Sequence, residues 1–301
     1  MRPRWKLSRL LNPSVPDGFL SILKPPGMTS HDVVAFLRRK LGTRRIGHAG
    51  TLDPPACGVL PMAVGRATRL IPYLAADKEY VAEIVFGRST STGDAEGMVR
   101  ESRDVSVSRE MLEAVLPRFL GEIQQRVPMV SAVHVGGKRL HELAREGIEI
   151  VDRPVRTVTI HDLELQRFTP GSQPLALLRV ACSPGTYIRT LAEDLGEALG
   201  VPASLTFLLR TRSSGIGLEA SVRLEDEPLW LSWNEALGHL DLHEATEDEF
   251  RAVGHGKALE ARQPRPEGTQ VRIQQGNRML AIAEQHGMAL RMRTVLLTGD
   301  D

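Results

Sequence analysis

The order of apolar and polar residues predicts short strands alternating with helices in the first part of the chain. Residues 19–23 form an apolar run that a Lys-Pro-Pro-Gly stretch stops, as at the end of a strand. A helix is predicted to begin at Thr29 or Ser30, since Val33, Val34, Leu37 and Leu41 then fall on one face. Gly42 is expected to end it.

The alternation of short strands and helices is predicted to continue to about residue 217. A helix is expected to begin after residue 64 and to end near Asp77, and Ser108 is expected to cap another. Residues 90–97 are interpreted as a turn-rich hairpin connection. Strands are predicted at 80–86, 155–167 and 175–182, and a helix with its apolar face on Ile188, Leu191, Ala192, Leu195 and Leu199.

Past Gly217 the pattern changes. Residues 219–249 are acidic and predict a connecting region with one helix, whereas short apolar runs at 271–273, 279–283 and 295–297 predict a small barrel. We therefore expect a polar extension over 1–17, a main domain over 18–240 and a small β-rich domain over 241–301.

Composition fits a globular protein of 301 residues with 42% hydrophobic residues. We see no apolar run near the roughly 18 residues that a membrane span needs, and no apolar segment for a secretory signal. Cys57 and Cys182 show neither metal-ligand spacing nor a disulfide framework. A reducing cytoplasm is the expected location.

Charge is unevenly distributed although the net charge is only +1. Residues 1–50 carry ten Lys/Arg against two Asp, a balance of +8, and residues 219–249 carry ten Asp/Glu against one Arg, a balance of −9. This asymmetry suggests a polyanion-binding face on one side. On charge alone, two solvated faces are the better explanation.

The most distinctive stretch is 47–61, Gly-His-Ala-Gly-Thr-Leu-Asp-Pro-Pro-Ala-Cys-Gly-Val-Leu-Pro. Its glycines and prolines predict a shaped loop around one carboxylate, Asp53, whose backbone Pro54 biases toward an extended conformation. On these residues alone, a functional carboxylate and a turn aspartate that bonds its own backbone are about equally plausible.

This stretch resembles the central motif of the TruB family of tRNA pseudouridine synthases, G-H-x-G-T-L-D-P-x-A-x-G-V-L-P. Other stretches resemble further family motifs in the same order, at 24–30, 65–69, 182–191 and 205–212. The resemblance covers about residues 19–215. It implies an α+β pseudouridine synthase fold, with a mixed, largely antiparallel central sheet flanked by helices and a C-terminal PUA-like RNA-binding domain.

The resemblance also implies roles for named residues. Asp53 is implied to be the nucleophile, with Tyr80 stacking on the target base and assisting proton removal, and Arg189 is expected to pair with Asp53. His48, Tyr187 and Leu208 are implied to contact the substrate base or the space it leaves. Lys24, Arg44 and Arg45 are candidates for the RNA backbone.

The implied reaction breaks the bond from uracil N1 to ribose C1′ and reattaches the base through C5. It needs no redox change and no added atoms, so we expect neither a cofactor nor a metal. Attack by Asp53 at C1′, attack at C6 and abstraction of a ribose proton all stay open. A bidentate Arg189 is expected to keep the carboxylate charged in a pocket that excludes water.

The substrate implied by the resemblance is uridine 55 in the T-loop of tRNA, bound through the T-loop and T-stem by a monomer without an obligate protein partner. The chain departs from the family pattern at 127–130, at His141, where tyrosine is usual, and at Pro184, where lysine is usual. Two other hypotheses stay open: an RNA-binding or tRNA-folding protein, and a metal-dependent hydrolase using His48 and Asp53.

Overall fold

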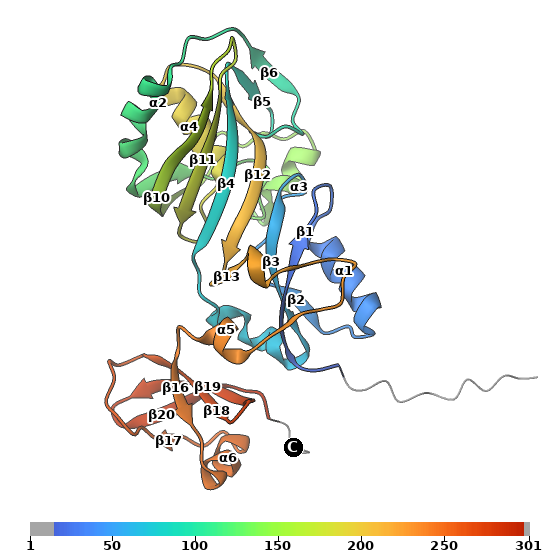
Figure 1. The fold of residues 1–301 in the computed structure, drawn as a ribbon, viewed down its shortest axis with the longest axis vertical. Helices are drawn as coiled ribbons and strands as arrows, with labels where there is room; N and C mark the ends of the chain where they lie inside the picture. Colours follow the sequence, from blue (N-terminus) through green and yellow to red (C-terminus); the bar gives the residue numbers. More distant parts are fainter. Residues whose placement is uncertain (1–14, 298–301) are drawn as a thin grey trace, which may run out of the picture.

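The computed structural model describes residues 15–297 and shows two β-sheets of unequal size (Figure 1). The larger sheet contains eleven strands, ordered β14-β1-β3-β12-β4-β11-β10-β7, with β13 on β12, β15 on β1 and β2 on β3. Only β1–β14 and β12–β3 pair in parallel among these strands. The predicted α+β fold with a mixed, largely antiparallel central sheet is therefore confirmed.

The strands of the larger sheet are β1 (Gly18–Lys24), β2 (Ile46–His48), β3 (Cys57–Val64), β4 (Lys78–Phe86), β7 (Gly121–Arg126), β10 (Val155–Thr169), β11 (Leu175–Cys182), β12 (Ala203–Ser213), β13 (Ile216–Gly217), β14 (Val222–Arg223) and β15 (Trp230–Leu231). Two small hairpins stand apart from it: β5 (Arg88–Thr90) with β6 (Val99–Ser102), and β8 (His134–Val135) with β9 (Lys138–Arg139). The first hairpin confirms the connection predicted at 90–97.

Helices pack on this sheet through their apolar faces. The helix α1 (Ser30–Leu41) has the expected Thr29 cap and ends at Gly42 in the left-handed conformation. Further helices of this part are α2 (Arg109–Val115), α3 (Leu140–Arg145), α4 (Ile188–Ala198), η2 (Leu116–Phe119) and η3 (Leu218–Ala220). A core of buried side chains from β4, β11, β12 and α4 holds α4 against the sheet.

Two predictions of local structure were wrong. The segment after residue 64 is a 3-10 helix, η1 (Gly65–Tyr73), which contains Pro72 and ends four residues before Asp77. The acidic region contains the start of a second helix: besides α5 (Trp233–Leu237), α6 (Glu247–Gly254) begins there. Both helices begin with a capping box, Ser232 with Glu235 and Thr246 with Glu249.

The smaller sheet has the order β16-β18-β19-β20-β17, formed by β16 (Asp241–Glu244), β17 (Leu259–Glu260), β18 (Gln270–Gln275), β19 (Arg278–His286) and β20 (Ala289–Val295). Its strands curl around a separate core with α6, which confirms the small β-rich domain. Within residues 15–297 the pairing is an open path and not the closed barrel that was expected. The division at 240/241 stays a prediction.

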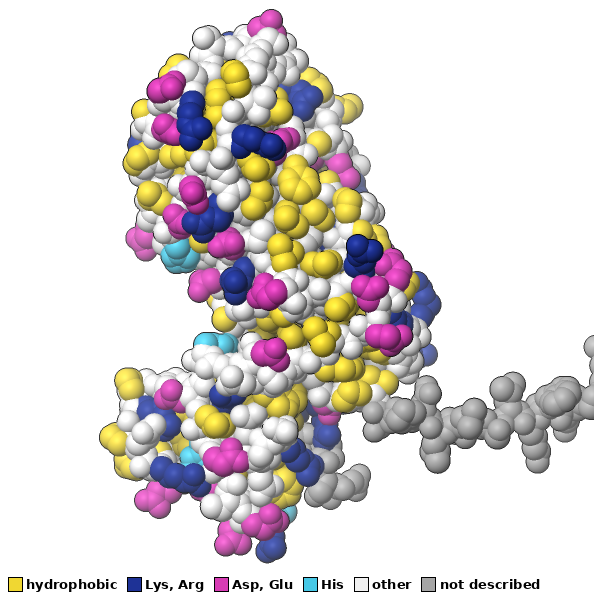
Figure 2. All heavy atoms as spheres, in the orientation of Figure 1, with side chains coloured by type: hydrophobic (Ala, Val, Ile, Leu, Met, Phe, Trp, Pro, Cys, Tyr) yellow, Lys and Arg dark blue, Asp and Glu magenta, His cyan; other side chains and the backbone are white. Residues whose placement is uncertain are grey.

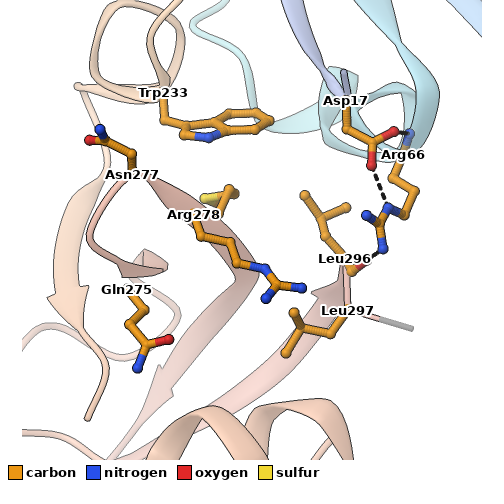
Figure 3. Close-up of a pocket in the computed structure, with 9 residues that line it drawn as sticks. Asp17, Arg66, Trp233, Gln275, Asn277, Arg278, Leu296 and Leu297 are labelled. Atoms are coloured by element: carbon orange, nitrogen blue, oxygen red, sulfur yellow. Dashed lines mark hydrogen bonds and ion pairs between the residues drawn. The ribbon is translucent and has the colours of Figure 1, made fainter. Parts of the chain in front are cut away.

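The two sheets meet at α5 and η1 (Figure 1). Arg66 binds the Asp17 carboxylate and donates to the Leu296 carbonyl at 2.9 Å, while Arg69 donates to the Val295 carbonyl at 2.7 Å. Trp233 and Leu296 line a cavity of about 510 Å³ at this junction (Figure 3). The guanidinium groups of Arg66 and Arg69 in η1 therefore bind the C-terminal end of the last strand to the main domain.

The charge blocks seen in the sequence are not on opposite sides. Lys40, at the end of α1, donates to the carbonyls of Leu224 and Glu225, which lie in the acidic region, at 3.4 and 2.8 Å. On the face drawn in Figure 2, Lys and Arg alternate with Asp and Glu. Four of the ten basic residues of 1–50, and most of the predicted extension 1–17, lie outside the described residues.

Candidate active site

The loop that carries Asp53 connects β2 to β3, and side chains from three other elements hold it. The Ser30 hydroxyl accepts from the Leu52 N–H at 2.9 Å and donates to the Leu52 carbonyl at 3.2 Å. The Lys24 ammonium donates to the Pro54 carbonyl at 3.1 Å. Arg210, on β12, donates to the carbonyls of Gly50 and Thr51. The backbone on both sides of Asp53 is therefore fixed by β1, α1 and β12.

The predicted ion pair between Asp53 and Arg189 is present. Nη2 of Arg189 lies 2.9 Å from Oδ2 of Asp53. The Arg189 side chain is 4% exposed and the Asp53 side chain 37% exposed. The cation is thus buried, while the carboxylate keeps one side open to a reactant.

The contact differs from the bidentate fork that was expected in a closed pocket. Arg189 also donates to the carbonyls of Thr92 at 3.0 Å and Val130 at 2.8 Å, and its Nε lies 3.8 Å from Oδ2 of Asp94. The guanidinium therefore divides its donors among three loops, and one of its nitrogens faces Asp53. This arrangement fixes the orientation of Arg189 before any substrate binds.

A cavity of about 250 Å³ opens beside Asp53. It is lined by Thr51, Leu52, Asp53, Lys78, Tyr80, Val130, Ser131, Ala132, Gly185, Thr186, Tyr187, Ile188, Arg189 and Leu208. Five of the residues predicted from the sequence are thus brought together: Asp53, Tyr80, Tyr187, Arg189 and Leu208. His48 is not among the residues that line this cavity.

Tyr80 forms one wall of the cavity and is 5% exposed. Burial raises the pKa of its phenol to about 12, against the opposing effects of the charge of Arg210 and a hydrogen bond from it. At neutral pH the ring therefore offers an aromatic face and a protonated hydroxyl.

Tyr187 is the residue before α4 and is held by its backbone. The Gln125 side chain, 1% exposed, accepts from the Tyr187 N–H at 2.9 Å and donates to the Tyr187 carbonyl at 3.2 Å. This pair of bonds fixes where the helix begins, and with it the position of Arg189 two residues later.

His48 ends β2, where it pairs with Met62. Burial lowers the pKa of its imidazole, and the nearby charge of Arg210 lowers it further. Its Nδ1 is buried without a hydrogen-bond partner. His48 is therefore a neutral ring at neutral pH, which suits stacking better than binding a phosphate.

Lys24 does not fit the role of a phosphate ligand. Its side chain is 1% exposed, and the ammonium donates to the carbonyls of Pro25, Met28 and Pro54. Burial lowers its pKa to about 8. We therefore correct this expectation and assign Lys24 to the support of the loop, whereas Arg44 and Arg45 are exposed as a backbone contact requires.

Several residues of the site were missed in the sequence. Asp94 lies in the segment interpreted only as a hairpin connection, and its carboxylate accepts from Thr92 Oγ1 and the Glu96 N–H. Arg210 and Gln125 occupy strands, where alternation alone does not show which polar residue turns inward. The signal that was available for Arg210 is its place in the 205–212 motif.

The arrangement suits chemistry on a flat ring. A charged carboxylate faces a cavity with two tyrosine rings and an apolar side chain, which can hold a base that has left its stack. Among the described residues, no group of three His, Cys, Asp or Glu side chains is placed to hold a metal ion. In the same part of the chain, no helix is long and apolar enough to cross a membrane.

Comparison with known families gives a match over half of the chain. Residues 38–188 match the model of the TruB family pseudouridylate synthase, N terminal domain. This range contains Asp53, Tyr80 and Tyr187, and ends one residue before Arg189.

Curated relatives share both sequence and length. The chain is 56% identical over 212 residues to a tRNA pseudouridine synthase B of Symbiobacterium thermophilum, covering 70% of this chain and 71% of the relative. It is 46% identical over 284 residues to a protein of the same name from Moorella thermoacetica, covering 88% and 93%.

Solved structures extend the similarity to nearly the whole fold. A chain in the structure of an H/ACA RNP bound to a substrate RNA containing 2′-deoxyuridine superposes with a TM-score of 0.70 at 26% identity, covering 93% of this chain and 85% of that one. A chain of a Cbf5-Nop10-Gar1 complex gives 0.70 at 28% identity, covering 94% and 86%.

Proposed function

The chain belongs to the TruB family of pseudouridylate synthases, and from this premise we propose that it converts uridine 55 in the T-loop of tRNA to pseudouridine, with Asp53 as the nucleophile. The protein is an RNA pseudouridine synthase, and tRNA is its substrate by the names of its relatives. The position in the tRNA and the roles of individual residues are the proposed part.

One observation carries the proposal. The Asp53 carboxylate, paired with a buried Arg189, opens onto a cavity walled by Tyr80 and Tyr187. A charged nucleophile must be held, and still be reachable by the reacting atom. Asp53 meets both conditions, because its loop is bonded on each side and its carboxylate is 37% exposed.

In the proposed reaction the target uridine leaves its stack and enters the cavity, at a cost of a few kcal/mol. The bond between N1 and C1′ breaks, the uracil turns, and a bond from C5 to C1′ forms. The proton on C5 leaves and N1 gains one, so no atom is added overall. Arg189 holds the Asp53 carboxylate in position, the rings of Tyr80 and Tyr187 hold the base, and Leu208 packs against it.

The RNA partner is proposed to bind as a folded T-loop and T-stem, recognised by shape and by its splayed bases. Exposed Arg44 and Arg45, just before the β2 strand that leads into the Asp53 loop, are proposed to contact its phosphates. We propose a monomer without an obligate protein partner. Both described cysteines are free thiols, and we propose the cytoplasm as the location.

The test is direct. Purified protein is incubated with an unmodified tRNA transcript, and pseudouridine is mapped by chemical labelling at single-nucleotide resolution. We expect product at uridine 55, its loss in Asp53→Asn, and normal product in the control Asp104→Asn, which changes an exposed carboxylate of the same charge. Product from Asp53→Asn at the wild-type rate would remove Asp53 as nucleophile, and product only at another uridine would refute the proposed position.

A further inference from the structure

Arg210 is a fully buried cation beside the site, with no exposed surface. Its guanidinium donates to three backbone carbonyls: Val59 at 2.8 Å, Gly50 at 3.0 Å and Thr51 at 3.4 Å. Burying a cation is costly unless its donors are satisfied. The three carbonyls belong to the start of β3 and to the loop that carries Asp53. All three hydrogen bonds of this guanidinium therefore hold that loop and the strand that follows it.

The sheet places Arg210 directly beside Tyr80. The two residues are cross-strand partners between β12 and β4, and partners in this register turn their side chains to the same face. The guanidinium lies close enough to the Tyr80 phenol for its positive charge to lower the pKa of that phenol, against the larger effect of burial. On its other side Arg210 pairs with Gly58 of β3.

We propose that Arg210 is a positioning residue of the reaction, which sets the Asp53 loop at a fixed distance from the Tyr80 hydroxyl. One planar group binds the loop at Gly50 and Thr51 and lies beside Tyr80 on the neighbouring strand. It therefore joins two parts of the site between which the described residues form no backbone hydrogen bond. The inference rests on the proposed function, since it concerns how Asp53 and Tyr80 meet one substrate ring.

The shape of the guanidinium is essential to this role. Its five N–H donors lie in one plane and point in different directions, whereas an ammonium is a point charge at the end of a flexible stem. Arg210→Lys keeps the charge but cannot bind the carbonyls of Val59, Gly50 and Thr51 together in the position beside Tyr80. A shift of about 1 Å between reacting groups costs on the order of 100-fold in rate.

The experiment compares Arg210→Lys with Arg212→Lys, which changes an exposed arginine two residues along the same strand. We measure tRNA affinity by filter binding and single-turnover pseudouridine formation with saturating enzyme. We expect about a 100-fold slower rate for Arg210→Lys, affinity within about threefold of wild type, and no change in Arg212→Lys. If Arg210→Lys does not fold, Arg210→Gln replaces it.

A double-variant cycle separates positioning from general support of the fold. If Arg210 acts through Tyr80, Arg210→Lys should slow a Tyr80→Phe enzyme much less than it slows the wild type. The proposal is overturned if the Arg210 variant keeps a rate within about threefold of wild type, if rate and affinity fall together, or if the two effects multiply independently. Failure of the wild type to make any pseudouridine would instead refute the proposed function.

Discussion

Arg189 Nη2 lies 2.9 Å from Asp53 Oδ2, although the first residue belongs to α4 and the second to the loop before β3. Two carbonyls from two further loops, Thr92 and Val130, hold the same guanidinium. Substituting Arg189 therefore alters how these loops meet as well as the charge near the nucleophile.

Arg189→Lys should retain the charge and lose the geometry. A lysine cannot serve Asp53, Thr92 and Val130 at once, so we expect single-turnover rates to fall about 100-fold and tRNA affinity to change little. Rate and affinity measured on the same preparation check this. A lysine enzyme with the wild-type rate would show that charge alone suffices.

Tyr80→Phe should separate the aromatic ring from the hydroxyl. The ring that stacks on the base remains, so tRNA affinity should stay within about twofold, while turnover falls because the hydroxyl is gone. Since the pKa of Tyr80 is raised to about 12, the phenol keeps its proton throughout pH 6–9. The wild-type rate should then show no inflection from Tyr80 in that range, and an inflection abolished by Tyr80→Phe would contradict this.

Local signals in the sequence predicted local structure well. Thr29 and Gly42 set the ends of α1, and the motif residues set the positions of β4 and α4, because caps and apolar faces act over a few residues. The capping-box residues at Ser232 and Thr246 are equally local signals, and they would have predicted the starts of α5 and α6. The family motifs likewise predicted that Asp53 pairs with Arg189, and the two side chains are in contact.

Contacts that depend on the tertiary fold were not accessible in this way. Asp94 reaches Arg189 because the connection between β5 and β6 lies against α4, where Gly93 approaches Arg189 and Glu193. Arg210 is buried because the face of β12 that carries it is covered by the Asp53 loop, to which it donates. Lys24 shows the opposite error: a lysine near a presumed RNA site is buried, because three carbonyls at the turn need a donor.

Gly58→Ala should be strongly destabilising. Gly58 has φ +108°, and an added Cβ would lie 2.2 Å from the Arg210 carbonyl oxygen, where β3 and β12 pair. We expect a loss of at least about 2 kcal/mol in the free energy of unfolding, measured by urea denaturation. The control is Gly200→Ala, which has φ +71° with nothing within 4 Å of the added atom; an equal loss in both would show that the close approach costs nothing.

Asp194→Asn should make the protein more stable at pH 8 and not at pH 4. Burial, with repulsion from Glu193 and Glu197, raises the pKa of Asp194 from 3.8 to about 7. The folded state therefore binds more protons than the unfolded state between these values, and this residue makes stability fall as pH rises from about 4 to 7. Asparagine does not titrate, so its advantage should be full above pH 7 and vanish below pH 4.

The full shift would correspond to about 4 kcal/mol at 1.36 kcal/mol per pH unit, and because Asp194 is only partly buried we expect about half of that, roughly 2 kcal/mol. Urea unfolding of wild type and variant at pH 4, 6 and 8 measures the difference, with Asp104→Asn as the exposed control. Asp194 shares α4 with Arg189 but is not among the residues that line the cavity beside Asp53. We therefore expect Asp194→Asn to leave the pseudouridine rate unchanged. An advantage equal at all three pH values would mean that it does not arise from titration of this carboxyl.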